Sequence, residues 1–207
     1  FYYTTTGWMM WNWLVGSLSC GAKILLFDGA PNYPSADILI KYCSSKKISF
    51  FGVSAKYIDF LKNKKFTSKK YDLKYLKTIA STGSPLLKES FDYIYKNIKK
   101  NVHLASISGG TDLVGCLVLG NLFSKVHAGE IQGESLGINV DIFNQKGASV
   151  KNKSKGELVV KKPFPSMPIR FWNDPSGIKY KNAYFNKFKN IWHHGDYAEK
   201  INKKGYI

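Results

Sequence analysis

Short apolar runs alternate with longer amphipathic segments over the first half of the chain. Four runs have the length of buried strands: 23–28, 48–53, 78–83 and 101–108. The segments between them carry apolar residues at helical spacing: 36–46, 54–62 and 86–99. Ser35 is placed to cap the first of these helices, and Pro85 to open the last. Such alternation predicts an α/β fold with a mainly parallel sheet flanked by helices.

The segment 7–20 comes before the first apolar run and contains three tryptophans and two methionines. It is apolar on nearly every side, so we expect a largely buried helix that ends near Gly21. Its tryptophans fit a protein core and a pocket wall better than a platform for nucleic-acid bases.

The pattern changes after residue 115, where glycines separate short segments of alternating apolar and polar residues, such as 137–143 and 157–160. These segments predict a small antiparallel β subdomain. We therefore expect an α/β layered subdomain at 1–120 and a β-rich subdomain at 121–207, without a flexible linker between them.

Composition indicates a folded, globular chain, because 44% of the 207 residues are hydrophobic and 15% are aromatic. No apolar run is long enough to cross a membrane, so we expect no membrane insertion, and the start does not resemble a signal peptide. Three widely spaced cysteines argue against a disulfide scaffold or a zinc site and favour a reducing, cytoplasmic location. Cys20 and Cys116 lie in apolar surroundings, and we expect both thiols to be buried.

The formal net charge of +17 raises the possibility of a nucleic-acid partner. Arg170 is the only arginine among the 31 basic residues, although proteins that read bases and phosphates rely heavily on arginine. The lysines are scattered along the chain. No specific nucleic acid is expected, but a non-catalytic basic module that binds polyanions through its lysines stays open as an alternative.

Two segments carry candidate ligand chemistry. The first ends the apolar run at 101–108 and continues as Gly109-Gly110-Thr111-Asp112, where a hydroxyl and a carboxylate could lie beside a phosphate and its magnesium ion. The second places Asp196 after a short apolar run, at an expected strand end, where its carboxylate could accept two hydrogen bonds from a ribose diol. Each is also compatible with ordinary turn chemistry. His193 and His194 do not predict a metal site, because adjacent strand residues face opposite sides.

The order of several blocks suggests a family. The segment 1–31 closely resembles the acyl-CoA synthetases of the adenylate-forming superfamily. The segments 106–120, 165–168 and 171–174 resemble its acetoacetate-activating branch, and 192–199 completes the match. The resemblance implies the central part of the N-terminal domain of such an enzyme, which uses ATP, Mg²⁺ and coenzyme A. In these enzymes a carboxylate first attacks ATP to give acyl-AMP, and the thiol of coenzyme A then displaces AMP.

The resemblance also implies roles for particular residues. It implies that the turn Gly83-Ser84-Pro85 lies against adenine, that Thr111 with Gly110 contacts the α-phosphate, and that Asp196 binds the ribose. Asp112 corresponds to the acidic magnesium ligand. Most members have glutamate at this position, so we expect a shorter reach or an intervening water.

The acyl pocket is implied by the same resemblance. Gly109 stands where acetyl-CoA synthetases have a tryptophan, and Trp8, Met9 and Met10 are the expected liners of a longer pocket that admits acetoacetate. Gly109 could instead be a plain turn glycine with both methionines in the core. The acid could also be acetate, propionate, butyrate or 3-hydroxybutyrate.

Three features of the family have no counterpart in this sequence: the phosphate loop with its lysine, an arginine that contacts the nucleotide, and the mobile C-terminal domain with its lysine. We therefore expect the N- and C-terminal portions of the same enzyme to be missing, and this segment to be inactive by itself.

Overall fold

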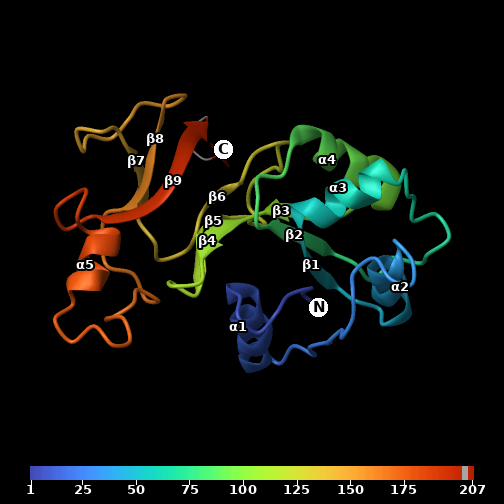
Figure 1. The fold of residues 1–207 in the computed structure, drawn as a ribbon. Helices are drawn as coiled ribbons and strands as arrows, with labels where there is room; N and C mark the ends of the chain where they lie inside the picture. Colours follow the sequence, from blue (N-terminus) through green and yellow to red (C-terminus); the bar gives the residue numbers. More distant parts are fainter. Residues whose placement is uncertain (202–204) are drawn as a thin grey trace.

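A computed structural model describes residues 1–201 and 205–207, and its centre is a three-stranded parallel sheet (Figure 1). The strands β1 (Phe50–Ser54), β2 (Thr78–Thr82) and β3 (His103–Ser106) lie in the order β1-β2-β3. The prediction of a mainly parallel α/β layer is therefore confirmed for this part of the chain.

The two faces of the parallel sheet differ in side-chain size. Phe51, Ile79 and Leu104 pack on one face against helices α2 (Ile38–Ser45), α3 (Ala55–Asn63) and α4 (Lys88–Tyr93), the last of which continues into a wider turn at Ile94–Ile98. The opposite face presents a row of small residues, since Gly52 pairs with Ala80 and Ala80 with Ala105. Helix α1 (Met9–Gly16) packs on this second face.

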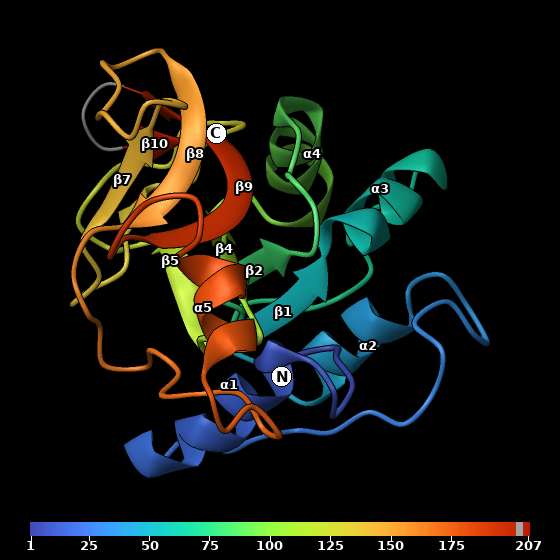
Figure 2. The same cartoon turned by 60° about the vertical axis from the view of Figure 1, so that its left-hand side comes forward.

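The second half of the chain is antiparallel β structure, as predicted, and it forms two sheets, the first of which begins before residue 120. The first contains β4 (Ser108–Gly110), β5 (Gly115–Leu119) and β6 (Gly133–Glu134); the second contains β7 (Val140–Phe143), β8 (Lys155–Val160), β9 (Trp192–Ile201) and β10 (Gly205–Tyr206). Figure 2 shows the short helix α5 (Ile178–Tyr184) below the strongly bent β9. Leu117, Val160 and Trp192 belong to one apolar core that joins these elements.

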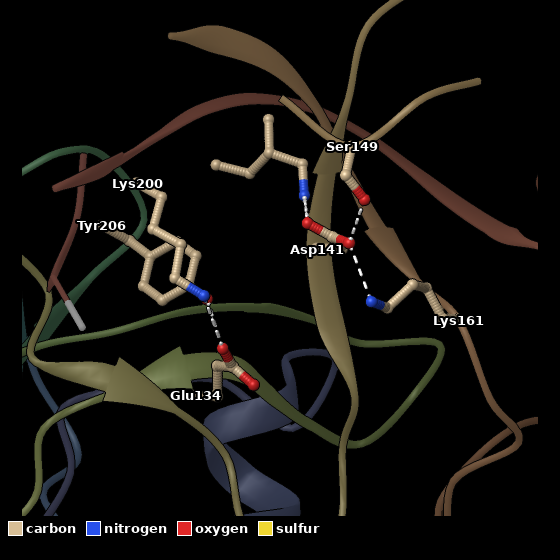
Figure 3. A network of polar contacts seen from close by, with 7 residues as sticks. Glu134, Asp141, Ser149, Lys161, Lys200 and Tyr206 are labelled. Atoms are coloured by element: carbon tan, nitrogen blue, oxygen red, sulfur yellow. Dashed lines mark hydrogen bonds and ion pairs between the residues drawn. The ribbon is translucent and has the colours of Figure 1, made fainter. Parts of the chain in front are cut away.

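Polar contacts connect the C-terminal strands to the sheet of β4, β5 and β6 (Figure 3). Glu134 of β6 accepts hydrogen bonds from Lys200 at 3.1 Å and from the hydroxyl of Tyr206 at 2.6 Å. On the neighbouring strand β7, Asp141 accepts bonds from Ser149 and Lys161. The bonds to Glu134 fix the position of β10, whose Tyr206 forms part of the site described below.

Several local expectations are wrong. Residues 23–28 form no strand, and α1 buries only Met9, Met10 and Leu14 because its other side faces solvent. The helix after Ser35 starts at Ile38, with Asp37 at the capping position. Cys20 is exposed, because the short turn after α1 projects away from the core, whereas Cys116 is buried as expected and burial raises its thiol pKa to about 12.

None of the described helices combines the length and apolar character that crossing a membrane requires.

Candidate active site

The predicted site residues gather around one cleft of about 570 Å³. The cleft lies between α1, the carboxyl ends of β2 and β3, strand β4 and the C-terminal strands β9 and β10. The predicted residues that line it are Trp8, Met9, Met10, Gly83, Ser84, Pro85, Gly109, Gly110, Thr111 and Asp196. Asp112 is the one predicted site residue outside the lining. The size suits a ligand larger than a short acid alone.

The floor of the cleft is the carboxyl edge of the parallel sheet. Neighbouring parallel strands end at the same edge, so the turn after β2 and the segment after β3 meet there. The hydroxyl of Thr82 donates to the carbonyl of Ile107 at 3.1 Å and locks the two strand ends together. Gly83 follows with φ of 85°, a left-handed conformation that glycine adopts without strain. The turn Gly83-Ser84-Pro85 thereby presents backbone to the cleft.

Gly109 lies in a very tight contact between β4 and β5. A Cβ built on Gly109 would stand 2.1 Å from the carbonyl oxygen of Gly115 and 2.5 Å from Cα of Cys116. Any side chain here would therefore collide with the backbone of β5 before it could enter the cleft. Close strand packing therefore requires glycine at this position.

The apolar wall of the cleft comes from α1. Met9 and Met10 are both buried and share a cluster with Ala80, Ala105 and Ile107. Trp8 is half-exposed at the rim. The row of small residues on the sheet leaves space that the flexible methionine side chains fill. The resulting apolar surface is a suitable environment for the apolar part of a short acid.

Asp196 lies in the middle of β9, so the expectation of a strand end is wrong. The pairing of β8 and β9 is interrupted here, since Leu158 faces the three residues His194, Gly195 and Asp196. Gly195 has φ of 94°, which turns the strand locally. The irregularity bends β9 and leaves the Asp196 carboxylate 55% exposed at the edge of the cleft, where a ligand can reach it.

Asp112 does not line the cleft, and the hydroxyl of Tyr184 in α5 donates a hydrogen bond to its Oδ2. Burial and, after it, the bond to Asp112 raise the pKa of Tyr184, so the phenol stays protonated as the donor. The tyrosine ring stacks on Trp192 with centroids 3.7 Å apart and an interplanar angle of 11°.

His194 lies between the two ligand segments and was not expected in the site. Its Nδ1 accepts from the indole N–H of Trp192 at 3.4 Å, and its Nε2 is 3.6 Å from Oδ2 of Asp196. A Cβ on Gly110 would lie 3.0 Å from the imidazole, so the ring also packs under the glycine loop. Burial lowers the His194 pKa, against the opposing effects of Asp196 and the Gly109 backbone.

His193 points the other way, as the strand alternation predicts. Its Nε2 is 2.9 Å from the buried carboxylate of Glu157, which also pairs with Lys187. Burial alone would raise the pKa of Glu157, but Lys187 and His193 bring it below its usual value. This cluster anchors β9 from its far side, and none of its three residues lines the cleft.

Asp112 is a candidate ligand for a magnesium ion that also binds the phosphates of a nucleotide. Within residues 1–201 and 205–207, no three His, Cys, Asp or Glu side chains are grouped to hold a metal alone. Mg²⁺ commonly binds one or two carboxylates together with substrate phosphates and water. Asp112 is exposed and next to Thr111, and Tyr184 occupies only one of its oxygens.

Known proteins resemble this chain in sequence. A family model described as AMP-binding enzyme matches residues 2–167. The acetoacetyl-coenzyme A synthetase of Rhizobium meliloti (strain 1021) is 52% identical over 200 residues, which is 96% of this chain and 31% of the relative. The acetoacetyl-CoA synthetase of Gallus gallus is 48% identical over 98% of this chain and 30% of its own length.

A solved structure extends the likeness to three dimensions. The acetoacetyl-CoA synthetase from Streptomyces lividans superposes on the whole chain with a TM-score of 0.93 at 36% identity, and the chain covers 32% of it. The chain thus spans about a third of the length of the relatives it matches.

Proposed function

Since this chain belongs to the AMP-binding enzyme family, we propose that it forms the ATP- and acyl-binding part of an acid–thiol ligase that converts acetoacetate to acetoacetyl-CoA. One observation carries the proposal: four distant segments line a single cleft. They are the turn Gly83-Ser84-Pro85, the glycine loop at 109–111, the apolar wall of α1 and Asp196. The relatives at 52 and 48% identity, both acetoacetyl-CoA synthetases, support the choice of acid.

The nucleotide is proposed to lie along the carboxyl edge of the parallel sheet. Adenine rests against the backbone of Gly83-Ser84-Pro85, and the Asp196 carboxylate accepts hydrogen bonds from the two ribose hydroxyls. The Thr111 hydroxyl donates to an α-phosphate oxygen. These contacts hold the α-phosphorus at the mouth of the apolar wall.

The acid is proposed to lie with its apolar end against Met9 and Met10 and its carboxylate toward Thr111. One carboxylate oxygen attacks the α-phosphorus, the bond to the bridging oxygen of the β-phosphate breaks, and pyrophosphate leaves. The sulfur of coenzyme A then attacks the acyl carbon, and AMP departs with the bonding electrons. Positioning and charge neutralisation dominate such transfers. Mg²⁺ held by Asp112 would neutralise phosphate charge.

The site is proposed to be divided between 1–120, which carries the nucleotide and acyl contacts, and 121–207, which ends in the ribose contact. The relatives are about three times longer, so we propose that further portions of the same protein complete the phosphate contacts and the thiol site. Three unpaired cysteines favour the cytoplasm as the location.

The decisive experiment is acid-dependent exchange between pyrophosphate and ATP by the full-length protein. Acetoacetate, 3-hydroxybutyrate, butyrate, propionate and acetate are compared at equal concentration, with Thr111→Val as a variant that removes the hydroxyl and keeps the volume. We expect acetoacetate to drive the fastest exchange and the variant to slow it. A faster rate with another acid would change the substrate. Exchange with none would overturn the ligase and favour a basic binding module.

A further inference from the structure

Two side chains outside the predicted set contact the two carboxylates of the site. Tyr184 donates to Asp112, and the Nε2 of His194 faces Asp196. Both belong to the same small cluster, because Tyr184 stacks on Trp192 and the indole N–H of Trp192 donates to His194. A continuous series of contacts therefore runs from Asp112 to Asp196 through three aromatic side chains.

The hydrogen bonds determine how His194 is oriented. An indole N–H can only donate, so Nδ1 of His194 carries no proton, and the neutral ring carries its proton on Nε2. That proton faces the Asp196 carboxylate at an N–O separation of 3.6 Å. The carboxylate is more than half exposed, and at this separation the N–H acts on it electrostatically, without a direct hydrogen bond.

Tyr184 acts on Asp112 in a similar way. Its ring is buried and fixed by the stack on Trp192, so the position of its hydroxyl oxygen is fixed beside Asp112. The bond to Oδ2 of Asp112 leaves Oδ1 as the oxygen that can face a metal ion. Hydrogen bonds to ligating carboxylates orient them and commonly change metal affinity by about 10- to 100-fold.

We propose that Tyr184 and His194 are positioning residues which, held by the common platform Trp192, orient Asp112 toward a metal-bound phosphate and Asp196 toward the ribose of the same nucleotide. The inference rests on the proposed function, since it requires a nucleotide in the cleft. Binding of the phosphate and of the ribose would then both depend on the cluster of Tyr184, Trp192 and His194, which lies outside the cleft lining.

Binding measurements on the full-length protein separate the two positions. Calorimetry would give the Kd of AMP without metal and the Kd of a non-hydrolysable ATP analogue with and without Mg²⁺. Tyr184→Phe keeps the stacked ring and removes only the donor. We expect it to weaken the Mg²⁺-dependent part of ATP-analogue binding by about tenfold, and to leave AMP affinity unchanged.

Tyr180→Phe is the matched control, because Tyr180 lies in the same helix and cluster but donates to the carbonyl of Pro168. It should change neither affinity. If Tyr184→Phe behaves like this control, the role of Tyr184 is wrong while the ligase proposal stands. If the unchanged protein binds neither AMP nor the ATP analogue, the proposed function is wrong and the inference is overturned with it.

At His194, two conservative variants separate its two nitrogens. His194→Gln places an amide N–H near the position of Nε2, whereas His194→Asn keeps an acceptor near Nδ1 and removes the donor. We expect His194→Asn to weaken AMP binding and His194→Gln to retain most of it. Equal losses in both variants would mean that the histidine only supports packing, and would overturn its positioning role.

Discussion

The phenol ring of Tyr2 lies directly on the backbone of Gly52, so that a Cβ on Gly52 would stand 2.2 Å from the ring. Gly52 begins the row of small residues that continues with Ala80 and Ala105 across the sheet. The same face carries Met9 and Met10 of α1. The apolar wall of the cleft therefore depends on a strip of sheet without bulky side chains.

Gly52→Ala should destabilise the protein, because the new methyl group overlaps a buried ring that has little room to move. Overpacking of this kind costs about 1–3 kcal/mol. Gly16→Ala is the control: this helical glycine has open space around its Cβ, and alanine there should be neutral or stabilising by roughly 0.5–1 kcal/mol. Urea denaturation of the two variants checks the difference; equal midpoints would contradict it.

Gly109→Ala should disturb the β4–β5 contact, since its Cβ meets backbone atoms that cannot rotate away. We expect a loss of stability of about 2 kcal/mol and slower exchange with every acid, because the glycine loop shifts as a unit. Gly7→Ala, whose Cβ has no neighbour within 4 Å, is the matched control. Slower exchange with acetoacetate alone would instead indicate a direct effect on the acyl pocket.

Met10→Ala should enlarge the space beside the apolar wall of the cleft and favour longer acids. Each methylene that becomes buried contributes about 0.8 kcal/mol, so a six-carbon acid should gain relative to butyrate by several-fold in kcat/KM. Met167→Ala removes a methionine that packs in another cluster and does not line the cleft. A parallel change in both variants would show that stability, and not pocket size, explains the result.

The stability of the protein should fall on mild acidification because of His194. Burial lowers its pKa, with Asp196 and Asp112 opposing this effect and His193 adding to it. An unfolded histidine titrates near about 6.5, so the unfolded chain takes up the proton first. The contribution of His194 is complete above that pH and is lost as the pH falls toward the lower folded pKa.

Urea midpoints between pH 7.5 and 5 measure this loss. His194→Gln removes the titrating group, so its midpoint should decline less steeply than that of the unchanged protein. Parallel curves would show that other groups cause the pH dependence.

The parts of the fold that follow local patterns could be predicted. The strands of the parallel sheet and helix α3 depend on adjacent residues and were expected near these positions. Residues 23–28 have a strand-like pattern but form no backbone hydrogen bonds with a neighbouring strand, because their apolar side chains pack beside the sheet and not within it.

The residues that contact Asp112 and Asp196 from outside the cleft could not be predicted from the sequence pattern. Tyr184 belongs to a short helix far along the chain from Asp112, and no spacing rule links the two. The interruption beside Leu158 that exposes Asp196 depends on the register of β8 with β9. The one available signal was the position of His194 two residues before Asp196, because alternate residues of a strand lie on the same side.

The walls of the cleft belong to different sheets: Gly83 follows the parallel sheet, whereas Asp196 and Tyr206 belong to the four-stranded antiparallel one. A nucleotide that contacts both sheets would hold them together for as long as it is bound. Ligand at 100 times its Kd would add about 2.7 kcal/mol to the folded state. Loss of the nucleotide should therefore lower the stability of the protein by the same amount.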